Sequence, residues 1–278
     1  MLCYSTGSLP DDFSFSRIAD VLAGSPFLGV ELVVTPAMLE RAADRAYWKG
    51  VRDLFHALGL AFRNVHLGMP HLLGPEAHRP GLSCLDPTAR ARKAEAAKQA
   101  LAIAAFLDCP HVCLTTGLPE PGAGPEVEAE QLQTLEWEIS LLALHRPAGV
   151  SLLVEQEPEH VIRNATQLKA LGEAFPDAVF ANYDVGHGQV LGENIPAAIR
   201  SLGTLLRNVH LEDIRGRVHK HLLFGEGDVD FVAVFAAFRD VSYSGDYTPD
   251  LYPFKDDWER AMAASVAFLR EHGVIRPL

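Results

Sequence analysis

The sequence predicts an α/β protein folded as a single (β/α)₈ barrel, a TIM barrel. Short apolar runs of strand length alternate with longer segments of helical periodicity along the whole chain of 278 residues, giving about eight βα units. No linker, low-complexity segment or block of like charge interrupts this alternation, so residues 1–278 are expected to form one domain. An open doubly wound sheet is the alternative, but the GxGxxG motif of its dinucleotide-binding form does not follow an early strand.

Each expected element follows from its local pattern. Runs of apolar and β-branched residues predict strands at 2–5, 28–34, 61–67, 111–114, 150–155, 178–183, 205–211 and 247–251. Segments of helical period predict helices at 14–22, 36–58, 87–107, 126–145, 164–175, 195–202, 231–239 and 256–272. Asp86 and Pro87 supply an N-cap and a first-turn proline for the alanine-rich third helix. Gly273 is a common stop signal after the last helix.

The composition narrows the class of protein. Hydrophobic residues make up 48% of the chain, which excludes disorder, and 24 basic against 36 acidic residues give a net charge of −12. Binding to a nucleic-acid backbone is therefore not expected, because it depends on clustered Lys and Arg. The chain shows neither a signal-peptide pattern nor an apolar run of about 18 residues, and its four cysteines form no CxxC pair. A soluble cytoplasmic protein with reduced thiols, not associated with a membrane, is expected.

Residues that can bind a metal follow several of the expected strands. In a (β/α)₈ barrel the C-terminal strand ends converge on one mouth, where active sites lie. Each of these residues taken alone can be explained by an ordinary structural role, but their recurrence at one end of the barrel predicts a metal-binding site. The mixture of oxygen and nitrogen donors suits Mn²⁺, Zn²⁺ or Co²⁺ better than Ca²⁺. The residues are His66, Glu155, Glu157, Asp184, His187, His210 and Asp250.

Several motifs in a fixed order also carry a family resemblance. They include Gly29-Val30-Glu31-Leu32, Leu153-Val154-Glu155, Asp184-Val185-Gly186-His187, Asn208-Val209-His210-Leu211-Glu212-Asp213 and Gly225-Glu226-Gly227-Asp228. On these motifs the chain resembles, over essentially its whole length, the xylose isomerase-like superfamily of sugar isomerases and epimerases, which also contains the endonuclease IV branch. The resemblance implies one divalent metal ion (Mn, Zn, Co or Mg) bound by Glu155, Asp184, His210 and Asp250. Relatives have Glu where this chain has Asp250, whose side chain is one methylene shorter.

The resemblance further implies an isomerase or epimerase of carbohydrate metabolism that transfers a proton through an enediolate. Glu155 and Asp250 would be the acid–base pair on opposite faces of a small keto-sugar or sugar phosphate. His66, His187, Arg215 and Arg217 would bind the substrate. Simpler roles remain open for some of these residues: Asp250 can merely end a strand, and the two arginines can be solvated loop charges.

His219 and His221 add a further possibility. With His187 they are candidate ligands of a second metal ion, since the endonuclease branch has Asp-x-His at this spacing. A mobile polar loop or a contact to a substrate phosphate is the preferred explanation of the pair. An endonuclease IV-like phosphodiesterase is the alternative function, although Leu114-Thr115-Thr116-Gly117 lacks the His expected there. An inosose-type dehydratase and a barrel without catalytic activity are also compatible with the sequence, which does not indicate an oligomeric state.

Overall fold

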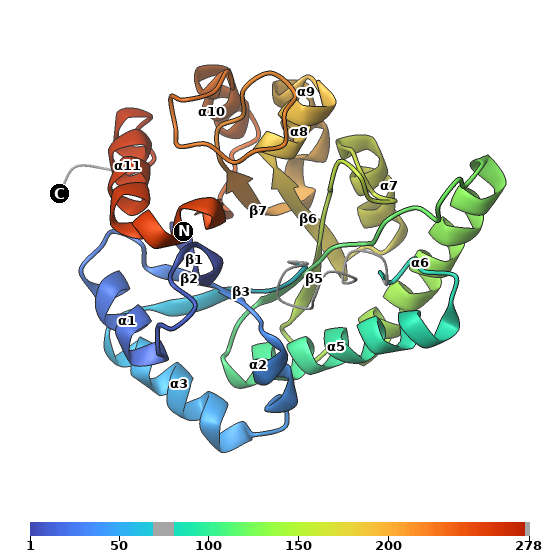
Figure 1. The fold of residues 1–278 in the computed structure, drawn as a ribbon, viewed down its shortest axis with the longest axis horizontal. Helices are drawn as coiled ribbons and strands as arrows, with labels where there is room; N and C mark the ends of the chain where they lie inside the picture. The colour runs from blue at the N-terminus through green and yellow to red at the C-terminus, as the bar shows by residue number, and fades with distance from the viewer. Residues whose placement is uncertain (69–80, 276–278) are drawn as a thin grey trace.

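Eight parallel strands form one sheet in which the strand order follows the chain order (Figure 1). The computed structural model describes residues 1–68 and 81–275. Leu2 bridges Tyr247 in parallel, and the Tyr247 amide donates to the Met1 carbonyl over 2.9 Å, so the first and last strands meet and nearly close the barrel. The expected (β/α)₈ fold is thereby confirmed. The strands are β1 (Cys3–Ser5), β2 (Gly29–Val33), β3 (Ala61–Leu67), β4 (His111–Leu114), β5 (Ser151–Glu155), β6 (Val179–Asp184), β7 (Leu206–Leu211) and β8 (Asp246–Pro249).

Helices surround the strands on the outside of the barrel (Figure 1). Side chains at the N-caps Ser14, Asp86, Asn164, Asn194 and Asp230 accept hydrogen bonds from amides of the first turn, which satisfies donors that lack partners inside the helix. None of the helices in the described part of the chain combines the length and the apolar character needed to cross a membrane. The helices are α1 (Phe15–Ala23), α2 (Pro36–Glu40), α3 (Arg45–Ala57), α5 (Pro87–Phe106), α6 (Pro125–His145), α7 (Ala165–Ala174), α8 (Val185–Leu191), α9 (Ile195–Leu202), α10 (Phe231–Asp240) and α11 (Trp258–Glu271).

The expected single helix over residues 36–58 is wrong, because the chain forms α2 and α3 with a break between them. Asp44 accepts a 3.0 Å hydrogen bond from the Tyr47 amide and begins the second helix. The Arg41 carbonyl, at the end of the first, accepts from the Trp48 indole over 2.8 Å. The continuous apolar periodicity concealed this N-cap. The last helix also begins later than expected, since residues 252–257 form a 3₁₀ turn, η3, before α11.

Helix α8 was not expected, because Gly186 and Gly188 lower the helix propensity of the segment after β6. Asp184 ends β6 and also caps this helix: its Oδ1 accepts a 2.7 Å hydrogen bond from the His187 amide. Gly186 is required by packing, since a Cβ there would overlap the Glu212 carboxyl and lie 2.6 Å from its Cδ. A short helix therefore fixes His187 beside the end of β6.

Apolar side chains fill the space between the barrel and its helices, with Trp48, Phe55, Phe62 and Phe238 among the largest fully buried ones. The inward-facing side chains near the C-terminal strand ends are instead polar. Barrel interiors are ordinarily filled by Val, Ile and Leu, so a buried polar layer marks a functional region. This layer includes Glu31, Asn64, His66, Asn182, Asn208, His210 and Thr248, all buried.

Candidate metal centre and active site

Three of the four predicted ligands lie together at the C-terminal ends of β5, β6 and β7. Glu155, Asp184 and His210 each offer a ligand atom, and these atoms all lie within 4.8 Å of one another. His210 Nδ1 is 2.7 Å from Glu155 Oε1 and 3.8 Å from Asp184 Oδ2. The register explains part of this proximity, since Asp184 on β6 pairs with His210 on β7. Parallel strands thus gather residues far apart in the sequence.

The chemistry of this group fits a divalent cation. Asp184 Oδ2 is buried and accepts no hydrogen bond from an N–H group of the described residues, which is costly for a carboxylate. Burial opposes ionisation of Glu155, but the imidazoles of His210 and His66 hold the pKa of this carboxyl well below its usual range. Two ionised carboxylates and one imidazole form the mixed donor set preferred by Mn²⁺, Zn²⁺ and Co²⁺.

Glu31 on β2 belongs to this site but was not among the predicted site residues. Its Oε2 lies 3.0 Å from His210 Nε2 and accepts hydrogen bonds from the amide groups of Asn64 at 2.7 Å and Asn208 at 3.4 Å. Burial opposes its ionisation, yet His210 and the amide donors lower the pKa of Glu31 to about 2. A carboxylate on the far nitrogen of a ligating histidine fixes the ring and its tautomer. The signal in the sequence was the single charge inside the otherwise apolar strand Gly-Val-Glu-Leu-Val.

Asp250, the fourth predicted ligand, follows β8 and lies beside His221. Its Oδ2 is 3.5 Å from His221 Nδ1, and that nitrogen is also 2.8 Å from the Asp250 carbonyl oxygen. Its carboxylate is not part of the group formed by Glu155, Asp184 and His210. Burial raises the pKa of Asp250, and the charges of Asp184 and Glu155 add to the rise.

Glu212, two residues after His210, brings a further carboxyl group to the site. Burial, followed by the charge of Asp184, raises its pKa well above the usual range. A hydrogen bond between the Glu212 and Asp184 carboxyl groups adds to this rise and lowers the pKa of Asp184. Glu212 is therefore a protonated neighbour of the Asp184 carboxylate.

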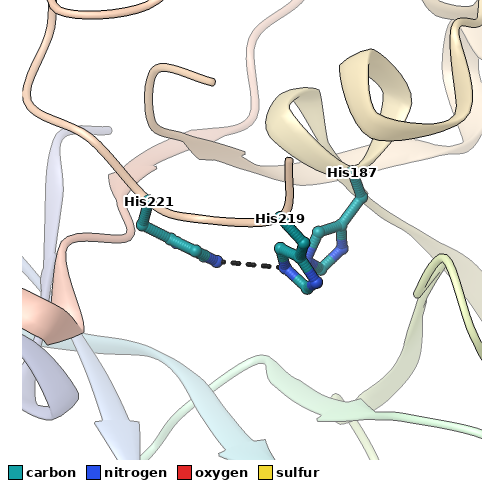
Figure 2. A group of neighbouring side chains, drawn as sticks. All are labelled: His187, His219 and His221. Atoms are coloured by element: carbon teal, nitrogen blue, oxygen red, sulfur yellow. Dashed lines mark hydrogen bonds between the residues drawn. The ribbon is translucent and has the colours of Figure 1, made fainter. Parts of the chain in front are cut away.

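The three predicted histidines of the second cluster do come together (Figure 2). His187 from α8 and His219 and His221 from the loop after β7 place one ring nitrogen each within 4.8 Å of the others. His187 Nδ1 is 2.8 Å from the Gln156 carbonyl oxygen, and His221 Nδ1 is 2.8 Å from that of Asp250. When these Nδ1 atoms donate to the carbonyls, the Nε2 lone pairs stay available. Burial and the two neighbouring imidazoles lower the pKa of His219 to about 4.

The other predicted substrate-binding residues differ in position. His66 is buried, and its Nε2 lies 2.7 Å from Glu155 Oε2. Arg215 and Arg217 are exposed in the loop after β7. Arg215 donates to the Glu226 carbonyl, and the guanidinium of Arg217 lies over Gly192. The structure thus places His66 within the site and leaves both arginines at its margin.

Glu157, two residues beyond Glu155, adds an acid–base group near the second cluster. Its Oε2 is 3.6 Å from His187 Nε2. Burial raises the pKa of Glu157 to about 7, with further increases from the charges of Glu155 and Asp184. Burial would lower the pKa of His187, but Asp184, Glu157 and Glu155 outweigh it and raise that pKa to about 9.

The fold and this site define a (β/α)₈ barrel whose C-terminal mouth carries a buried cluster of carboxylate and imidazole groups that could hold a metal ion. The chain belongs to the xylose isomerase-like TIM barrel family, whose model matches residues 20–272. The sequence-based assignment to that superfamily is therefore confirmed.

The chain is similar in sequence to curated relatives and similar in fold to solved structures. The chain is 27% identical to inosose dehydratase of Geobacillus kaustophilus over 45% of its length, and 27% identical to L-ribulose 3-epimerase of Mesorhizobium japonicum over 68%. These matches span 49% and 64% of the two relatives.

Among solved structures, a D-psicose 3-epimerase with D-fructose has a TM-score of 0.75 at 18% identity, covering 97% of this chain and 98% of that one. The IolI protein with a bound zinc atom has a TM-score of 0.78 at 13% identity, covering 98% and 97%. At these identities the structural matches establish the shared barrel fold.

Proposed function

We propose that the protein is a divalent-metal-dependent sugar epimerase or isomerase that moves a proton next to a carbonyl group. The observation that carries this proposal is the buried group of Glu155, Asp184 and His210 at the barrel mouth. Relatives named L-ribulose 3-epimerase and D-psicose 3-epimerase support a ketose as substrate, and the relative with a zinc atom supports a metal. The substrate would be a small ketose or its phosphate.

Glu155, Asp184 and His210 would hold the metal ion. When bound, a divalent ion supplies stabilisation of negative charge on the substrate oxygens as the proton is removed. The donor set favours borderline ions such as Mn²⁺, Zn²⁺ and Co²⁺, with Mg²⁺ as the remaining choice.

The two proposed acid–base residues have pKa values displaced in opposite directions. The low pKa of Glu155 keeps it a carboxylate, so it can accept the proton from the substrate carbon. Burial raises the pKa of Asp250, which favours it as the group that returns a proton on the other face. Carboxyl groups whose environments separate their pKa values are a common acid–base arrangement. His66 Nε2 lies 2.7 Å from Glu155 Oε2 and would hold the carboxylate in place beside the substrate.

The cluster of His187, His219 and His221 would bind a second divalent ion. Nδ1 of His187 and of His221 each faces a backbone carbonyl, so Nε2 is the nitrogen that each ring has left for a cation, which would displace the His187 proton on binding. Arg215 and Arg217 would approach the substrate from the loop after β7. Metal content per chain tests the second ion: we expect His219→Ala to remove one equivalent, and an unchanged content would contradict this role.

Deuterium exchange tests the proposed reaction. The chelator-treated protein would be incubated in D₂O with D-fructose, D-psicose, D-tagatose and L-ribulose, with and without Mn²⁺, Co²⁺ or Zn²⁺. We expect metal-dependent incorporation of one deuterium beside the carbonyl of at least one ketose, together with its epimer or isomer. Absence of exchange with every ketose and metal would refute the proposal.

A dehydratase is the second candidate, favoured by the similarity to inosose dehydratase. Proton removal beside a carbonyl by Glu155 is common to both reactions, but the dehydratase then expels a hydroxyl group as water. Mass spectrometry of an inosose incubation distinguishes the two, since the dehydratase product is lighter by one water.

A further inference from the structure

A second group of potential ligands lies on the opposite side of Glu155. Cys113 on β4, His66 on β3 and Glu155 on β5 each offer one ligand atom, and these atoms all lie within 4.8 Å of one another. His66 and Cys113 are paired in the strand register, so their side chains leave the barrel wall side by side. All three side chains are buried. We propose that Cys113, His66 and Glu155 bind a thiophilic divalent cation, with Cys113 ligating as a thiolate.

The orientation of Glu155 allows it to serve two cations. Its Oε1 lies 2.7 Å from His210 Nδ1, whereas its Oε2 lies 2.7 Å from His66 Nε2. One oxygen thus faces the group of Asp184 and His210, and the other faces His66 and Cys113. Carboxylates that face two ways bridge metal pairs, which typically lie about 3.5–4 Å apart.

The surroundings of Cys113 are polar, unlike those of an inert core thiol. The Asn182 side-chain amide donates to Cys113 Sγ over 3.4 Å, as it would to a thiolate. The thiol is also in hydrogen-bonding contact with the His66 imidazole, and the neighbouring Asn182 Oδ1 is buried without a hydrogen-bond partner among the described residues. By contrast, Cys109 donates its thiol hydrogen to the His111 carbonyl over 3.4 Å and lies outside the group.

The ligand set selects the metal. One sulfur, one imidazole nitrogen and one carboxylate oxygen suit Zn²⁺ or Co²⁺, and disfavour Mg²⁺ and Ca²⁺. Binding would replace the thiol proton, which leaves to solvent. The inference shares Glu155 and His66 with the proposed function, but metal binding at Cys113 does not require turnover.

Cobalt titration of the full-length, chelator-treated protein tests the proposal. We expect a near-ultraviolet thiolate-to-cobalt charge-transfer band to appear as Co²⁺ binds. Cys113→Ser should abolish this band and lower the bound cobalt by one equivalent, while the visible bands of the other sites remain. The matched variant Cys109→Ser should retain the band. A wild-type protein without the band, or loss of the band in the Cys109 variant alone, would overturn the proposal.

A second measurement does not depend on any variant. X-ray absorption at the zinc edge of the wild-type protein should show a sulfur neighbour at about 2.3 Å. Only nitrogen and oxygen neighbours at full zinc loading would overturn the proposal. Sulfur ligation without deuterium exchange would refute only the proposed epimerase function, and exchange without sulfur ligation would refute only the role of Cys113.

Discussion

Replacing Glu31 by Gln tests whether the buried carboxylate on β2 stabilises the metal centre. The Gln oxygen can still accept from Asn64, so the change removes a charge while preserving the shape of the side chain. His210 then loses the anion 3.0 Å from its Nε2. We expect weaker metal binding and a less stable metal-free protein, because both depend on the imidazole being held by that charge.

The magnitude follows from the pKa of Glu31, which is about 2 in the folded protein against an ordinary 4.5. At 1.36 kcal/mol for each unit, the difference corresponds to about 3 kcal/mol. Because the folded pKa is lowered, this stabilisation is complete above the unfolded value of 4.5 and is lost as the pH falls through 2. The difference between the wild type and the variant should therefore shrink from about 3 kcal/mol at pH 7 to about 1 kcal/mol at pH 3.

Denaturant unfolding of the chelator-treated proteins measures this difference, and a competition titration with zinc measures affinity. The loss of a carboxylate behind a ligating histidine should weaken zinc binding roughly 10–100-fold. Glu138→Gln is a matched control, since Glu138 pairs with Arg90 at 2.9 Å between helices outside the barrel. It should alter stability by less than about 1 kcal/mol and leave zinc affinity unchanged. Equal stability and zinc affinity in the Glu31 variant and the wild type would refute the reasoning.

The remaining predictions concern catalysis, a buried lysine and a tight helix contact. Glu155→Gln should lower kcat roughly 10²–10⁴-fold without changing the circular dichroism spectrum, and full activity would show that Glu155 is not the base. Burial lowers the pKa of Lys93 to about 8, so Lys93→Met should stabilise the protein by about 1–3 kcal/mol at pH 7. This gain should fade as the pH rises from 8 towards 10.5. Urea unfolding at pH 7 and pH 10 measures both values, and a less stable variant at pH 7 would contradict the prediction. Gly186→Ala should cost about 1–3 kcal/mol in thermal unfolding, because its Cβ would collide with the Glu212 carboxyl. Adding Glu212→Ala should recover part of that loss, and no recovery would locate the strain elsewhere.

The strands and the helices were predictable to different degrees. Buried parallel strands read as apolar runs, so all eight were found within a few residues of their bounds. Helix ends depend on single capping contacts, which apolar periodicity does not report. The cap at Asp44 and the glycine-containing helix α8 were therefore missed. The segment between the expected strand at 61–67 and the expected helix at 87–107 lies largely outside the described residues.

By itself, the sequence determined the fold and the set of strand ends that carry Glu155, Asp184 and His210. That was possible because parallel strands in one barrel place all their C-terminal ends at the same mouth, so chain order alone indicates which residues converge. Only the tertiary structure decided which atoms meet. It brought Glu31 from β2 against His210 from β7, turned Asp250 towards His221, and set Cys113 beside Glu155. These contacts depend on strand register and side-chain rotamers across the barrel interior, which no local sequence pattern encodes.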